Sequence, residues 1–167
     1  MIFTLFISFV ILLRLGELIL SKKNEKWLLQ HGAVEYGKEH YPFIVALHSL
    51  FFVSLIIEYA TQQISTFSLP ILVFYFIILA VKVWVISSIG KFWNTKIFRI
   101  QRISSIKKGA YKYVKHPNYL IVIFEIALIP LAFHLYYTAI IFSVLNAVIL
   151  TIRIREENQV LQIPSTV

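Results

Sequence analysis

The sequence predicts an all-α integral membrane protein with about five transmembrane helices, forming a single membrane domain over residues 1–167. Hydrophobic residues make up 59% of the chain and charged residues only 14%, whereas about a quarter of the residues in soluble domains are charged. The mean hydropathy is +0.78. The apolar residues also fall in long blocks that suit the thickness of a bilayer, so the chain is expected to lie in a membrane.

The first apolar block covers residues 2–20, and its length as a helix matches a hydrocarbon core of about 30 Å. It starts without a basic residue and runs into Glu17 and two lysines, so we expect a retained helix rather than a signal peptide. Pro130 near the end of the fourth block predicts a kinked or tightly turned hairpin. The later blocks occupy residues 43–60, 69–89, 119–133 and 136–152.

These blocks divide the chain into three N-terminal transmembrane helices, within residues 1–89, and a C-terminal part, residues 90–167. The second part supplies a polar loop, a helical hairpin and a tail, which we expect to form the cofactor site. Polar loops this long in a small protein often carry function.

Fourteen of the sixteen lysines and arginines lie in the first loop, the third loop and the C-terminal tail. Because positive charge near span ends resists translocation, this predicts a multi-pass protein of the cell membrane with its N-terminus outside and its C-terminus in the cytoplasm. Membrane topology explains most of the net charge of +8, and attraction to anionic lipid headgroups is the next contribution. Because the chain has no nucleic-acid-binding motif, we expect no nucleic-acid partner. The fourteen are Lys22, Lys23, Lys26, Lys38, Lys91, Lys96, Arg99, Arg102, Lys107, Lys108, Lys112, Lys115, Arg153 and Arg155.

The composition excludes several kinds of site. The chain contains no cysteine and no aspartate, which excludes disulfides, thiolate metal sites, Ser-His-Asp triads and aspartate-based phosphoryl transfer. Its five glycines are too scattered for a GxGxxG loop, so no Rossmann-type cofactor site is expected. No HExxH or paired-histidine spacing is present, and we expect no metal site.

Five ionisable residues fall inside the apolar blocks, where each would cost several kcal/mol if it faced lipid unpaired. Arg14 and Glu17 are spaced i, i+3 and are expected to pair on one helix face. Glu58 lies near the outer end of its span, where it is expected to reach water. Lys82 and Glu125 come from different helices, and two interpretations stay open: an interhelical ion pair, or a contact with substrate.

Residues 107–119 read KKGAYKYVKHPNY and lead directly into the fourth block. Gly109 permits a turn, and Pro117 suits the first turn of a helix. His116 is thereby placed beside a helix N-terminus, which favours an anion. An interfacial belt of aromatic and basic residues is the alternative interpretation. The predicted topology puts a second polar segment, RIREENQVL at residues 153–161, on the same side of the membrane, so the two segments are expected to meet.

GAYKYVKHPNY resembles the GPYRYVRHPxY signature of the isoprenylcysteine carboxyl methyltransferase family, and RIREENQVL resembles the R...EE..L element that follows it. This resemblance covers about residues 85–161. Ala110 replaces the signature proline, and Asn158 stands at the second position of the EE pair. The first-loop sequence NEKWLLQHGAVEYGKEHYP is similar to a small bacterial branch associated with O-methylation of alkylpyrones. The chain ends soon after Leu161, before the aromatic extension of the protein-methylating members, so a prenylated-protein substrate is not expected.

The resemblance implies S-adenosylmethionine as cofactor, bound on the cytoplasmic side, and a lipophilic acceptor that enters from the bilayer. The cofactor's carboxylate would suit His116 and the lysine-rich loop, and its amine and ribose would suit Glu157 or Asn158. Arg153 would orient an anionic acceptor as the catalytic residue. The cofactor-binding candidates are His116, Tyr113, Tyr119, Glu157, Asn158 and Glu156, and the substrate-binding candidates are Arg155, Glu125 and Lys82.

We therefore expect an integral membrane O-methyltransferase acting on a carboxylate or an acidic enol or phenol of a lipid, with alkylpyrones favoured. An acceptor that is already ionised requires no strong base, which fits a chain without a triad. Alternatives are an isoprenylcysteine carboxyl or phospholipid N-methyltransferase, and more distantly a nicotinamide-dependent sterol reductase. A small transporter or scaffold is suggested by Glu17, Glu58 and Lys82, although the chain lacks the inverted repeats of many transporters.

Overall fold

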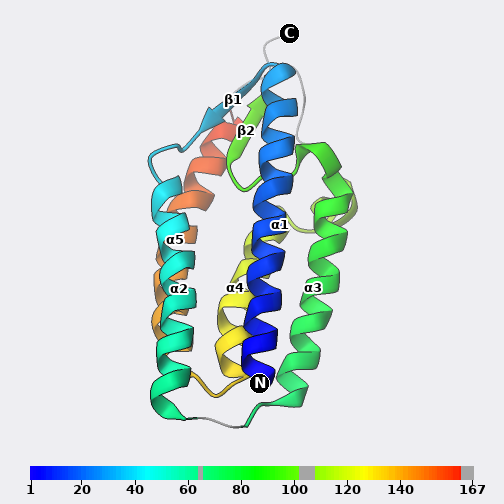
Figure 1. Cartoon of the computed structure of the whole chain (residues 1–167). Coiled ribbons are helices and arrows are strands. Elements are labelled where there is room, and N and C mark those ends of the chain that lie inside the picture. Colours follow the sequence, from blue (N-terminus) through cyan, green and yellow to red (C-terminus); the bar gives the residue numbers. More distant parts are fainter. Residues whose placement is uncertain (64–65, 102–107, 163–167) are drawn as a thin grey trace.

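The computed structural model describes residues 1–63, 66–101 and 108–162, which form one helical bundle (Figure 1). Arg102 and Lys107 of the basic loop lie outside the described residues. The helices are α1 (Ile2–Gln30), α2 (Tyr41–Gln62), α3 (Leu69–Ile89), α4 (Pro117–Leu131) and α5 (Tyr136–Gln162). Two short strands, β1 (Ala33–Tyr36) and β2 (Ile97–Ile100), and two 3-10 turns, η1 (Gly90–Phe92) and η2 (Gly109–Lys112), lie between them.

Four helices of the described chain, α1, α2, α3 and α5, are long and apolar enough to cross a membrane. The fourth predicted span is α4, which has 15 residues and is about 22 Å long, shorter than a hydrocarbon core. It occupies only the half of the bundle nearer the N-terminus (Figure 1). The helical membrane fold is thus confirmed, with one span shorter than the others.

Both terminal helices are longer than their apolar blocks. α1 continues from residue 20 to Gln30, and α5 continues from residue 152 to Gln162, because no glycine or proline interrupts the polar sequence that follows each block. These extensions and the two strands lie at one end of the bundle, opposite the N-terminus (Figure 1). The described parts of the first loop, the third loop and the tail therefore lie at one end of the bundle, as predicted.

Two short strands, which the sequence did not predict, lie beside the helical bundle. β1 and β2 pair antiparallel, with Ala33 opposite Ile100 and Tyr36 opposite Ile97, and they join the first loop to the third. Gly32 and Gly37 flank β1 with φ angles of +78° and +64°, a backbone region that glycine enters without strain. β-branched and aromatic side chains in both segments favour the extended conformation.

The predicted hairpin between the last two helices is tight. Pro130 lies in the last turn of α4, and its carbonyl accepts a hydrogen bond from the backbone N–H of Leu135 at 3.0 Å. His134 adopts a left-handed φ of +58°. The chain therefore reverses within a few residues, and α4 and α5 pack side by side.

Glu58 does not reach water as expected. It is 7% exposed, and its carboxylate accepts hydrogen bonds from the backbone N–H groups of Tyr137 at 3.1 Å and Thr138 at 2.7 Å. The side-chain amide of Gln62 donates a third at 3.0 Å. Because the first N–H groups of a helix have no partner within it, Glu58 caps α5 from a neighbouring helix.

Aromatic side chains fill the core near the N-terminus of the chain. The ring of Phe3 stacks on Tyr59, with centroids 3.7 Å apart, and meets the edge of Phe133 at 5.1 Å. Phe6 packs edge-on against Tyr75 at 5.1 Å. Such pairs stabilise a core beyond the area that they bury, so this end of the bundle is closely packed.

Candidate functional site

A cavity of about 630 Å³ opens at the end of the bundle that carries the strands. Its volume lies within the usual range for small-molecule sites. Glu157 is the one acidic residue among the described residues that line it. The wall combines the aromatic residues Phe92, Trp93, Phe98, Tyr111, Tyr113 and Tyr119 with the basic residues Lys96, Arg99, Lys112, Lys115 and Arg153.

A close approach of the backbone at Gly109 to α3 positions the segment that forms one wall of the cavity. Gly109 has a φ of +52°, and a Cβ added there would lie 2.0 Å from the Ser88 hydroxyl oxygen of α3. Only glycine fits this approach, so the predicted turn is confirmed. The chain then forms η2 and enters α4 at Pro117, with His116 at the N-cap and no side chain capping the helix.

The two polar motifs meet at this wall, as predicted. The Nε2 atom of His116 lies 3.2 Å from the Oδ1 atom of Asn158. The hydroxyl of Tyr119 donates a hydrogen bond to the carboxylate of Glu157. The rings of His116 and Tyr119 stack with centroids 5.4 Å apart. Side chains from the start of α4 and the end of α5 thus form one cluster.

One buried nitrogen in this cluster lacks a hydrogen bond. The Nδ1 atom of His116 is buried and makes no hydrogen bond to the described residues, although a carboxylate oxygen of Glu157 lies 3.5 Å away. When Nε2 donates to Asn158, Nδ1 of the neutral ring is an acceptor. A buried polar atom without a hydrogen bond is costly and calls for an explanation such as a bound water, an ion or a catalytic role, so this atom is a candidate for a ligand contact.

Arg153 lies at the boundary between this cavity and a second, smaller pocket. Its Nε atom donates to the Tyr119 hydroxyl at 2.9 Å, and its Nη2 atom donates to the backbone carbonyl of Thr95. The guanidinium also lies 5.4 Å from the centre of the Tyr119 ring. Arg153 is therefore held in one orientation, with access to two cavities.

Three other candidates lie at the edges of the site. Glu156 lines the smaller pocket, where its carboxylate is 4.0 Å from His40, and not the cavity at His116. Tyr113 lines the cavity but is 77% exposed, and Arg155 is exposed on α5. Ligand contacts of these three residues stay predictions.

The wall of the cavity that precedes β2 was not predicted from the sequence. Trp93 is 2% exposed, lines the cavity and donates from its indole N–H to the Oδ1 atom of Asn118 at 3.3 Å. The presence of Trp93 and Asn94 in an otherwise basic loop was the available signal. Burial raises the pKa of the Tyr111 phenol, and the nearby Glu157 carboxylate adds to the rise, so Tyr111 stays a neutral hydrogen-bond donor.

Lys96 ties the two polar loops together beside the cavity. Its ammonium lies 2.9 Å from the Glu25 carboxylate and 3.4 Å from the Glu35 carboxylate. Burial alone lowers the pKa of Lys96, but the hydrogen bond to Glu25 and the charge of Glu35 outweigh it, and the pKa is raised. Lys96 therefore carries its charge at any physiological pH.

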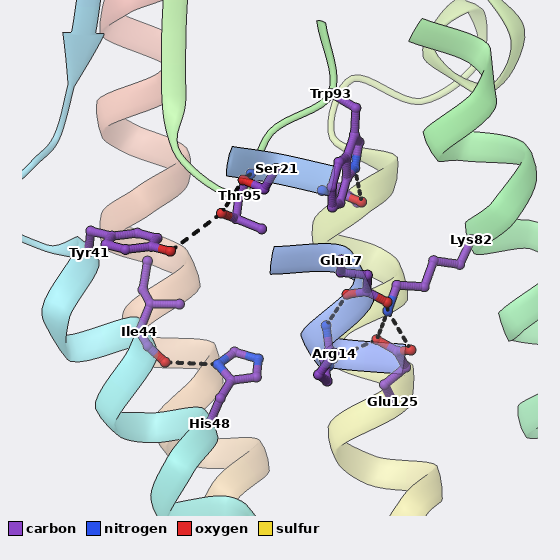
Figure 2. A network of polar contacts seen from close by, with 11 residues as sticks. Arg14, Glu17, Ser21, Tyr41, Ile44, His48, Lys82, Trp93, Thr95 and Glu125 are labelled. Atoms are coloured by element: carbon purple, nitrogen blue, oxygen red, sulfur yellow. Dashed lines mark hydrogen bonds and ion pairs between the residues drawn. The ribbon is translucent and has the colours of Figure 1, made fainter. Parts of the chain in front are cut away.

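A separate ionic cluster lies deeper in the bundle (Figure 2). Arg14 contacts Glu17 at 2.9 Å and Glu125 at 2.8 Å, and Lys82 contacts Glu125 at 2.9 Å as well as Glu17. Both predicted pairings are thus confirmed, as parts of one cluster that joins α1, α3 and α4. A contact of Lys82 or Glu125 with substrate stays a prediction.

The described residues define a helical membrane protein with a cavity at one end of the bundle, lined mainly by aromatic and basic side chains. The model of the isoprenylcysteine carboxyl methyltransferase (ICMT) family matches residues 69–163, more than half of the chain. The chain belongs to this family, and family membership together with the apolar helices supports a membrane methyltransferase.

Two bacterial proteins are similar over most of their length. The uncharacterized protein YpbQ of Bacillus subtilis is 43% identical over 96% of each chain. An uncharacterized protein of Haemophilus influenzae is 30% identical over 89% of this chain and 88% of its own. No solved structure matches the chain.

Proposed function

We propose that the protein is an S-adenosylmethionine-dependent O-methyltransferase of a lipophilic acceptor, with an alkylpyrone-like lipid as the favoured substrate. The observation that carries this proposal is the buried Nδ1 atom of His116, which makes no hydrogen bond to the described residues and lies beside Glu157 in a cavity of about 630 Å³. It lies where the two family motifs meet.

The residues of the cavity fit S-adenosylmethionine by their chemistry. Glu157 suits the cofactor's ammonium group, and so does Nδ1 of His116, because as an acceptor it cannot donate to the carboxylate that was expected beside it from the sequence. Lys112 and Lys115, beside the uncapped N-terminus of α4, suit its carboxylate. The aromatic walls suit the adenine ring and the positive sulfonium. When bound, the cofactor supplies an electrophilic methyl group.

The protein's part in the reaction is to position the acceptor oxygen and exclude water. An acidic enol or carboxylate is already ionised, so no base is required. Arg153, fixed by Tyr119 and Thr95, orients this anion by charge-assisted hydrogen bonds. We assign Asn158 and Tyr113 to the cofactor side, and Arg155, Lys82, Glu125 and Glu156 remain candidates for further ligand contacts.

We also propose that the basic end of the bundle faces the cytoplasm and that the acceptor enters from the cell membrane. The excess of lysine and arginine at this end supports the orientation. Because the chain has no cysteine, single cysteines can be introduced by Lys38→Cys and by Tyr137→Cys at the other end. In intact cells, an impermeant maleimide should label Tyr137→Cys and spare Lys38→Cys. The reverse pattern would contradict the orientation.

Cofactor binding is tested by calorimetry of S-adenosylmethionine and S-adenosylhomocysteine with the detergent-purified protein. We expect micromolar binding that His116→Ala abolishes while the variant stays folded. No binding by the folded wild-type protein would overturn the proposal. Acceptors are then screened with a radiolabelled methyl group, alkylpyrones first, against isoprenylcysteine and phosphatidylethanolamine. If phosphatidylethanolamine is the only acceptor that becomes labelled, the protein is an N-methyltransferase and the proposed O-methylation is wrong.

A further inference from the structure

The polar extension of α1 carries a buried serine that contacts the cavity wall. Ser21 is 4% exposed, and its hydroxyl donates to the Oδ1 atom of Asn94 at 2.9 Å. The backbone N–H of Thr95 donates to the same hydroxyl at 3.1 Å, and the two hydroxyl oxygens of Ser21 and Thr95 are 2.8 Å apart (Figure 2). In return, the Asn94 amide donates to the Ser21 carbonyl at 2.9 Å.

A second buried polar residue lies one helical turn further along the same face. Asn24 is 5% exposed, and its side-chain amide donates to the carbonyls of Trp93 at 2.7 Å and Gly90 at 3.2 Å. Ser21 and Asn24 together therefore bind both ends of residues 90–95. A buried polar side chain is unfavourable unless it is hydrogen-bonded, and here every such bond goes to this one segment.

The segment that α1 holds contributes directly to the proposed site. Phe92, Trp93 and Asn94 line the large cavity. The carbonyl of Thr95, the residue anchored by Ser21, accepts the hydrogen bond from Arg153. A shift of this segment would move one wall of the cavity and the partner of Arg153 together.

We propose that Ser21 and Asn24 are positioning residues, which fix the wall formed by residues 90–95 for cofactor binding and hold Thr95 for Arg153. This inference rests on the proposed function. It gives a role in the site to α1, which lies outside the part of the chain that the family model matches. Neither residue touches the reacting groups, so both act through the segment that they anchor.

The first experiment needs no ligand. In a Trp27→Phe, Trp84→Phe background, Trp93 is the single tryptophan, and acrylamide quenching reports how often its wall opens. We expect Ser21→Ala to raise the quenching constant about twofold, because the wall loses an anchor and opens locally. Ser21→Thr keeps the hydroxyl and should restore the wild-type value.

The matched control is Ser54→Ala. Ser54 also makes an interhelical hydrogen bond, to the Thr138 hydroxyl at 2.8 Å, but it does so near the opposite end of the bundle. Its loss should leave Trp93 quenching unchanged, even where it lowers the unfolding temperature as much as Ser21→Ala does. Equal quenching in Ser21→Ala and the wild type would overturn the inference.

The second experiment is calorimetry of S-adenosylhomocysteine with the same variants. We expect Ser21→Ala to weaken binding about tenfold, with recovery in Ser21→Thr and no change in Ser54→Ala. Unchanged affinity in Ser21→Ala would overturn the positioning role. If the wild-type protein binds no S-adenosylhomocysteine, the proposed function fails, while the quenching result still decides whether α1 positions the wall.

Discussion

The bundle contains two polar clusters of opposite character. The deep cluster of Arg14, Glu17, Lys82 and Glu125 pairs two cations with two anions at short distances, and none of the four lines either cavity described above. The cluster at His116 and Glu157 lies on an open cavity and keeps a buried nitrogen without a hydrogen bond.

We therefore expect the deep cluster to stabilise the fold and the cluster at His116 and Glu157 to contribute to binding. In the deep cluster, every charge is satisfied within the protein, so a ligand would have to displace an existing ion pair. At the cavity, the buried Nδ1 atom of His116 makes no hydrogen bond to the described residues, and a ligand can supply one. Residue type alone does not make this distinction, because both clusters combine arginine with glutamate.

The largest expected effect is a loss of stability in the deep cluster. Glu125→Ala should lower the free energy of unfolding by about 3–5 kcal/mol, because it leaves Arg14 and Lys82 to share Glu17. Reversible unfolding in mixed micelles measures this. The Lys82→Met, Glu125→Met double variant retains the pair of Arg14 and Glu17 and should lose less. A double variant that is less stable than Glu125→Ala would contradict this account of the cluster.

The next effect comes from the backbone contact beside the cavity. Gly109→Ala should destabilise the protein by about 1–3 kcal/mol, because the new Cβ meets Ser88 and the positive φ is unfavourable for alanine. Binding of S-adenosylhomocysteine should weaken as well. Gly16→Ala is the control, since no atom lies within 4 Å of its Cβ position in α1. Equal stability of the two variants would show that the contact with Ser88 is not tight.

A smaller effect, on cofactor affinity, is expected when the Tyr119 hydroxyl is removed from the cluster at His116 and Glu157. Tyr119→Phe keeps the ring against His116 but removes the group that joins Glu157 to Arg153. We expect affinity for S-adenosylhomocysteine to fall about tenfold, with little change in stability. Tyr136→Phe, at the other end of the bundle, should bind like the wild type. Full affinity in Tyr119→Phe would remove this hydroxyl from the site.

The sequence predicted the parts of the fold that depend on local pattern. Apolar blocks located the helices, Pro117 located the start of α4, and the predicted topology placed the segments that contain His116 and Asn158 on the same side of the membrane. The contacts of Ser21 and Asn24 could not be predicted, because they bind a segment about seventy residues away that has no regular periodicity. For the same reason, the pairing of β1 with β2 was missed.

Glu58 shows a second kind of error. Its position near the outer end of α2 suggested solvent exposure, whereas its actual partners are backbone N–H groups of α5. These groups become available only because the tight turn after α4 brings the start of α5 beside α2. A carboxylate at a span end can therefore be a structural cap, and composition alone does not distinguish the two cases.

The smallest expected effect distinguishes two arginines on α5. Arg153 and Arg155 are two residues apart, so their side chains leave the helix on nearly opposite sides, and only Arg153 is held by Tyr119 and Thr95. Arg155→Ala should change stability by less than about 0.5 kcal/mol and leave affinity for S-adenosylhomocysteine unchanged. If Arg155 contacts the acceptor, Arg155→Ala should raise the KM for the acceptor and leave the affinity for the cofactor unchanged. If Arg155→Ala loses as much cofactor affinity as Tyr119→Phe, Arg155 also belongs to the cluster at His116 and Glu157. The binding site would then extend beyond Arg153 to the other side of α5.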